Sequence, residues 1–225
     1  MATIETVTLE VADPAAVDRF HATAFGLDTR IRLRASEAPT TGFRGFTLAL
    51  TVSQPADVNG FIDAALDAGA TSLKPAAKSL WGYGGVVQAP DGTIWKIATS
   101  AKKDTGPATR KIDEIVLLLG VADVIASKRF YVGRGLAVAK SFSRVYVEFA
   151  AGESPVTGES PVTGESPVKL ALYRRRALAK DLGVSPEGTG THGLLIGGDA
   201  GPFTDPDGFA WEAASLAGSA GHHRA

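Results

Sequence analysis

The stretch WGYGGVVQAPDGTIWKIATS, residues 81–100, has apolar and β-branched runs on both sides of Asp91-Gly92. Asp-Gly is favoured in the tight turns of β-hairpins because these turns need a positive φ. In the second run, Trp95 and Lys96 are neighbours and therefore project to opposite faces of a strand. The stretch predicts a β-hairpin whose tryptophan packs in a core while the lysine faces the other side of the sheet.

The same hairpin returns near the end of the chain as FTDPDGFAWEAAS, residues 203–215, where Glu212 takes the place of the lysine. A second matched pair lies earlier in each half. IETVTLEVADPAAVDRFHATAFGL, residues 4–27, resembles IDEIVLLLGVADVIASKRFYVGRGL, residues 112–136. Two dispersed matches in the same order indicate that the chain arose by duplication.

The duplication predicts two homologous domains, over 1–101 and 110–217, joined by the polar linker 101–109 with its Gly-Pro break. Residues 152–168 contain GESPVT twice and then GESPV. Gly, Ser, Pro and Glu favour a solvated loop between two strands, and a ligand or partner motif is the alternative interpretation. The tail 218–225 is expected to be disordered.

Composition limits the classes of function. The 225 residues are 44% hydrophobic and 21% charged, and the net charge of −1 argues against a nucleic-acid partner. The absence of cysteine excludes disulfides, thiolate metal sites and a cysteine nucleophile, and it suits a cytoplasmic protein. No apolar run approaches the roughly 18–20 residues of a membrane span, and the N-terminus lacks the pattern of a signal peptide. We therefore expect neither a membrane partner nor secretion.

Helical spacing of apolar residues predicts a helix from Pro14 with Asp13 as its N-cap, and further helices over 56–69 and 124–133. RRRALAKDLG predicts a short basic helix. The second half has no counterpart of the helix at 56–69, because GLLIGGDAGPFTDPDG goes almost directly from strand to turn.

The succession of strand, helix, several strands and a DPDG hairpin resembles the vicinal oxygen chelate superfamily, the group of glyoxalase I, type I extradiol dioxygenases and bleomycin-resistance proteins. The resemblance rests on VTLEVAD, FTLALTV, AALDAGA, WGYGGVVQAPDGTIWKIA, KRFYVGRGL and FTDPDGFAWEAA, which together span both halves. It implies an α+β fold of two tandem glyoxalase-like domains, built from βαβββ modules whose curved mixed sheets form cavities.

The resemblance also implies where a metal would lie, because enzymes of this superfamily hold a divalent cation with His and Glu ligands on strands. In the first half those positions fall on Thr6, Thr47 and Lys96. Two hydroxyls and an ammonium do not form a metal site, since a protonated lysine has no lone pair and repels a cation.

In the second half the same positions fall on Glu114, His192 and Glu212, while the fourth falls on Ala171 or a neighbour. Three such ligands could bind Zn²⁺, Fe²⁺, Ni²⁺ or Mn²⁺ with waters completing the shell. Two interpretations stay open: a polar pocket with no cofactor, or a divalent metal held by these three residues.

Aromatic side chains would line a cavity that has lost its metal, because they stack on planar ligands. The candidate ligand-binding residues are Phe46, Trp81, Tyr83, Tyr146, Phe149 and Tyr173. Among them, Trp81 and Tyr83 flank glycines that let a ligand or another backbone approach closely. The run Arg174–Arg176 is either a clamp for an anionic ligand or a solvated helix start.

These patterns predict a metal-free small-molecule-binding protein that sequesters a hydrophobic or aromatic natural product, with antibiotic resistance as the biological role. The alternative is a metal-dependent lyase, isomerase or dioxygenase working in the second half, where Glu114 or Glu212 would move a proton. A regulatory or structural module with a vestigial cavity is the third hypothesis. A homodimer is left open.

Overall fold

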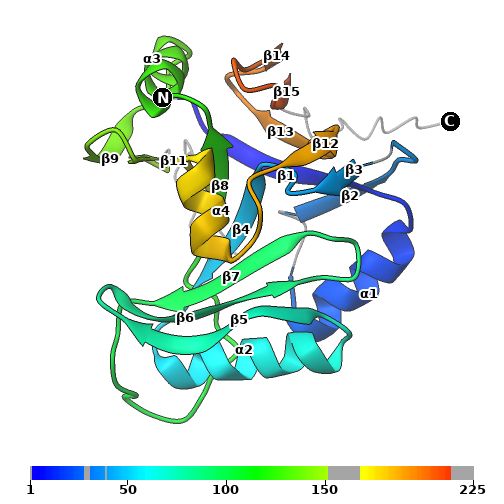
Figure 1. Cartoon of the computed structure of the whole chain (residues 1–225), viewed down its shortest axis with the longest axis vertical. Helices are drawn as coiled ribbons and strands as arrows, with labels where there is room; N and C mark the ends of the chain where they lie inside the picture. Colours follow the sequence, from blue (N-terminus) through cyan, green and yellow to red (C-terminus); the bar gives the residue numbers. More distant parts are fainter. Residues whose placement is uncertain (1, 28–30, 39, 152–167, 214–225) are drawn as a thin grey trace, which may run out of the picture.

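The computed structural model describes residues 2–27, 31–38, 40–151 and 168–213 (Figure 1). The predicted repeat loop, apart from Val168, and the predicted tail lie outside these residues. The predicted helices are confirmed as α1 (Pro14–Ala24), α2 (Pro55–Asp67), α3 (Val124–Gly133) and α4 (Arg175–Leu182). The Asp13 carboxylate accepts a hydrogen bond from the Ala16 N–H at 3.0 Å, as expected of the N-cap of α1.

The larger sheet has eight strands in the order β5-β6-β7-β4-β8-β11-β10-β9. Their bounds are β4 Phe46–Thr51, β5 Thr71–Ser79, β6 Gly82–Gln88, β7 Ile94–Thr99, β8 Glu114–Val121, β9 Val138–Phe142, β10 Tyr146–Phe149 and β11 Lys169–Arg174. The opening stretch forms the predicted hairpin of β6 and β7. The central antiparallel pair is β4 with β8, so this sheet joins strands of the first half to strands of the second.

A second sheet has five strands in the order β14-β15-β13-β1-β2, and a small pair links β12 with β3. Their bounds are β1 Ile4–Val11, β2 Ile31–Ala35, β3 Thr40–Gly42, β12 Gly188–Gly190, β13 Leu194–Gly198, β14 Phe203–Thr204 and β15 Ala210–Ala213. Here β1 of the first half pairs with β13 of the second. The α+β class is confirmed, and both large sheets cross the boundary at 101–109. The division into two domains stays a prediction.

The eight-stranded sheet has two chemically different faces. On the core face, Leu48, Leu50 and Trp95 are fully buried and belong to the main hydrophobic cluster, which α1, α2 and α3 help to form. The opposite face carries the alternate residues Thr47, Ala49, Lys96, Leu118 and Ala171, which register places side by side on neighbouring strands. We call this the α4 face, because α4 contacts its strands β8 and β11 (Figure 1).

Both hairpin tryptophans pack in the main core, as predicted: Trp95 is 0% exposed and Trp211 is 3% exposed. Residues 199–202, between β13 and β14, contain no helix, so the missing counterpart of α2 is confirmed. Within the described part of the chain, no helix combines the length and apolar character that crossing a membrane requires.

Candidate functional site

Helix α4 fills much of the α4 face. Leu178, Ala179 and Leu182 are buried on its inner side, in a cluster with Val86 and Ile94 of the sheet. Burial of leucines on this scale stabilises the helix by about 1.5–3 kcal/mol per side chain. A segment of the chain itself therefore packs on this face, where the resemblance implies a cavity.

Two lysines of the sheet hold the end of α4 in place. Lys96 Nζ lies 2.5 Å from the Asp181 carboxylate. Lys74 Nζ donates to the carbonyl oxygens of Lys180 and Asp181 at 2.8 and 2.5 Å. Because the last carbonyls of a helix carry partial negative charge, the Lys74 ammonium is favourably placed there.

A cavity of about 310 Å³ remains between this end of α4 and strands β5, β6 and β7. Its charged lining residues are Lys74, Lys78, Lys96 and Asp181. Among the described residues, Lys78 forms no ion pair. With three ammonium groups and one carboxylate, the charged lining is net positive by two, and such a lining favours an anion.

Two aromatic residues, Trp81 and Tyr83, also line this cavity, and the Tyr83 side chain lies on the opposite face of the sheet, against α2. Trp81, at the turn from β5 to β6, is 84% exposed, and Tyr83 is half-buried with its hydroxyl donating to Asn59 Oδ1 at 2.9 Å. A Cβ on Gly82 would clash with the Thr99 carbonyl oxygen, and a Cβ on Gly84 would come within 2.8 Å of the Ile97 carbonyl oxygen. These glycines therefore serve the close approach of β7.

The other predicted aromatics lie elsewhere. Phe46 and Phe149 are 2% and 1% exposed and belong to the main core, and Phe46 reaches only a void of about 10 Å³. Tyr146 and Tyr173 face each other edge to face, with ring centroids 5.9 Å apart. Burial, with the neighbouring Glu148 carboxylate, raises the pKa of Tyr146, and burial raises the pKa of Tyr173. Trp81 and Tyr83 alone of the six share the 310 Å³ cavity.

The three residues of the alternative metal site do not come together. Glu114 lies on β8 of the eight-stranded sheet and forms an ion pair with Lys169. Glu212 lies on β15 of the other sheet and faces Arg34 at 3.6 Å. The described residues contain no group of three His, Asp or Glu side chains placed to hold a metal ion. The donor set does not fit a divalent cation.

His192 has a structural role in this arrangement. Its Nδ1 and Nε2 atoms lie 2.5 Å from the Arg44 carbonyl oxygen and 3.0 Å from the Asp207 carbonyl oxygen, and its ring stacks on Phe209 at 3.9 Å. Each ring nitrogen lies against a backbone carbonyl oxygen, so neither points into an open space where a metal could bind.

Sequence reasoning predicted the helix α4 but missed that one side of it is buried, and it missed the lysines of the cavity. RRRALAKDLG has apolar residues at Leu178, Ala179 and Leu182, which lie on one side of a helix, and this pattern predicts a buried side. No sequence pattern indicated that Lys74 and Lys96 would meet Asp181, because their approach depends on how α4 docks.

No protein-family model and no curated protein sequence matches the chain. Among solved structures, glyoxalase I from Zea mays matches with a TM-score of 0.57 at 14% identity, covering 95% of this chain and 92% of that chain. A candidate dioxygenase from Bacillus subtilis matches with a TM-score of 0.53 at 11% identity, covering 87% of this chain and 69% of that chain. At these identities the likeness is one of fold.

Proposed function

We propose that this chain, which has the fold of the vicinal oxygen chelate superfamily, binds a planar aromatic anion in the cavity between β5–β7 and the end of α4. The observation that carries the proposal is that Trp81 and the lysines Lys74, Lys78 and Lys96 line one cavity. Binding of this kind suits sequestration of an aromatic natural product, and antibiotic resistance would be its consequence.

The size of the cavity supports a small ligand. Its volume of about 310 Å³ lies at the lower end of the roughly 300–1,000 Å³ range of ligand pockets. Trp81 would stack on an aromatic ring, while Lys78 would pair with a carboxylate or sulfonate at its edge. A single chain supplies every lining residue, so the proposed site does not need a homodimer.

Catalysis through a metal finds no support in the donor set. Glu114 and Glu212 lie in different sheets and face cations of the chain, and His192 is engaged with backbone. The proposed function therefore consists of binding, without a chemical step.

The test uses three probes of one shape: 2-naphthoate, neutral 2-naphthamide and cationic 2-naphthylmethylammonium. Isothermal titration should give the tightest binding for naphthoate at this cavity, with affinity that falls as salt rises. Trp81→Ala should weaken naphthoate binding about three- to tenfold, because stacking contributes about 0.5–1.5 kcal/mol. Lys78→Gln should remove the preference for naphthoate over naphthamide.

Lys102→Gln serves as the control, because Lys102 is an exposed lysine of the linker outside the cavity lining. Equal affinity of naphthoate and naphthamide in the wild type, or unchanged naphthoate binding in both Trp81→Ala and Lys78→Gln, would refute the proposal.

A further inference from the structure

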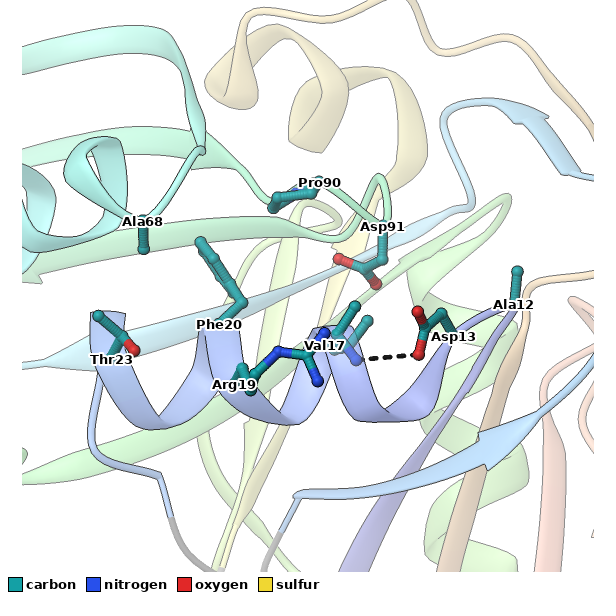
Figure 2. A pocket seen from close by; sticks show the side chains of 10 residues that line it. Ala12, Asp13, Val17, Arg19, Phe20, Thr23, Ala68, Pro90 and Asp91 are labelled. Atoms are coloured by element: carbon teal, nitrogen blue, oxygen red, sulfur yellow. Dashed lines mark hydrogen bonds between the residues drawn. The ribbon is translucent and has the colours of Figure 1, made fainter.

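A second cavity, of about 670 Å³, lies between α1, the end of α2 and the turn of the β6–β7 hairpin. Val17 and Phe20 of α1 supply apolar walls, together with Ala68 and Pro90 (Figure 2). The carboxylates of Asp13 and Asp91 lie at one end of this cavity, near the start of α1 (Figure 2). None of its lining residues belongs to the aromatic cavity beside α4.

In the second half of the chain, hydrogen bonds join the corresponding helix, α3, to the corresponding Asp-Gly turn. Asp207, in the second Asp-Gly turn, accepts hydrogen bonds from the Ala122 N–H at 2.7 Å and from the Ser127 hydroxyl at 2.8 Å. These bonds tie the turn directly to the start of α3. Asp207 corresponds to Asp91 in the repeated hairpin.

In the first half this connection is missing. Asp13 and Asp123 are both N-caps, and four residues after each comes Val17 in α1 but Ser127 in α3. Valine cannot donate to the turn. Asp91 instead accepts from its own neighbour, the Thr93 hydroxyl, at 2.5 Å, and among the described residues it forms no bond to α1.

Two buried polar atoms of the first half also lack partners, on residues that do not themselves line the cavity. His21, the residue after Phe20, is 4% exposed, and its Nε2 atom has no hydrogen-bond partner among the described residues. Trp95 Nε1, whose ring meets the His21 ring at 5.3 Å, is likewise unpartnered. In the second half the corresponding Tyr131 and Trp211 are hydrogen-bonded. The contact between α1 and the β6–β7 hairpin thus leaves a cavity and has fewer hydrogen bonds than the corresponding contact of α3 in the second half.

We infer that the cavity beside α1 binds an organic cation with an apolar body. Asp91 lacks the donor that its counterpart receives from α3, and an ammonium group would supply a charged donor in addition to the nearby Arg44 guanidinium. Asp13 adds a second carboxylate at the same end, while Arg19 contributes one positive charge at the rim. Apolar atoms of the ligand would pack against Val17 and Phe20.

The probe for this site is 2-naphthylmethylammonium, with neutral 2-naphthylmethanol as the matched control. Isothermal titration should show that the ammonium binds about tenfold more tightly than the alcohol, as a charge-assisted hydrogen bond requires. Asp91→Asn should remove this difference, since the amide keeps an acceptor for Thr93 but loses the charge. Asp63→Asn, an exposed acid of α2, should leave it unchanged.

Val17→Ser is a second test, because it places in α1 a hydroxyl that corresponds to the Ser127 hydroxyl of α3. That hydroxyl could donate to Asp91 as Ser127 donates to Asp207. We expect it to weaken ammonium binding about tenfold. Equal binding of ammonium and alcohol to the wild type, or an ammonium preference that survives Asp91→Asn, would overturn the inference. Loss of ammonium binding in Trp81→Ala would also overturn the inference, because it would assign the cation to the aromatic cavity. The naphthoate test of the proposed function does not depend on any of these outcomes.

Discussion

Removal of one hydroxyl, by Tyr131→Phe, tests how the second half holds its hairpin to α3. Tyr131 is fully buried and donates to the Asp205 carboxylate at 2.6 Å, while its oxygen accepts from Trp211 Nε1 at 3.3 Å. Burial raises the pKa of Asp205, and the hydrogen bond from Tyr131 acts against this rise. The hydroxyl therefore serves a buried acid and a buried indole at once.

The expected cost follows from these two contacts. A hydrogen bond to a charged group contributes about 1.5–3 kcal/mol, and an orphaned indole N–H adds about 1 kcal/mol or more. Asp205 keeps hydrogen bonds from the backbone N–H groups of Asp207 and Phe209, which limits the loss. We expect Tyr131→Phe to lower the free energy of unfolding by about 2–4 kcal/mol.

Urea unfolding at pH 7.5, followed by circular dichroism, measures this loss. Tyr83→Phe is the control, because its hydroxyl bonds to Asn59 at an exposed site and its removal should cost less than about 1 kcal/mol. In an Asp205→Asn background the Tyr131→Phe loss should shrink, since no buried charge remains to be stabilised. A wild-type-like unfolding free energy for Tyr131→Phe would refute the reasoning.

Two further predictions concern α1 and α4. Burial lowers the pKa of His21, so the unfolded chain binds a proton at a higher pH than the folded chain, and the free energy of unfolding should fall as the pH drops below about 6.5. Urea titrations between pH 7.5 and 5.5 should show that His21→Phe lacks this part of the fall. A pH dependence equal to that of the wild type would contradict the prediction. Leu182→Ala should lower the free energy of unfolding by about 2–5 kcal/mol in the same assay, because the Leu182 side chain is 0% exposed beneath α4. A loss under about 1 kcal/mol, with hydrogen exchange of the α4 amides as in the wild type, would show that the helix is not packed there.

The fold followed from the sequence because the repeated hairpin and the helical spacing are local patterns. The pairing of strands between halves is not local: β4 meets β8 and β1 meets β13 through contacts that no periodicity encodes. The fold therefore separates the residues that the alternative metal site groups within the second half, because Glu114 lies in one sheet and Glu212 in the other.

The aromatic residues illustrate what alternation could have decided. Phe46 shares its side of β4 with Leu48 and Leu50, so strand alternation alone assigns it to the core face. Phe149 shares its side of β10 with Val147, which is also buried, so alternation assigns it to the core face as well. Trp81 reached the cavity because it lies at a turn, where no packing partner covers it.

The exchange of Lys96 for Glu212 after the two tryptophans now has a physical explanation in the partners of each residue. Lys96 faces Asp181 on α4, whereas Glu212 faces Arg34 of β2 across its own sheet. A carboxylate at position 96 would repel Asp181 and weaken the docking of α4 on the eight-stranded sheet. The lysine and the helix are therefore coupled, because a chain that covers this face with α4 and places Asp181 there is stabilised by a cation at position 96.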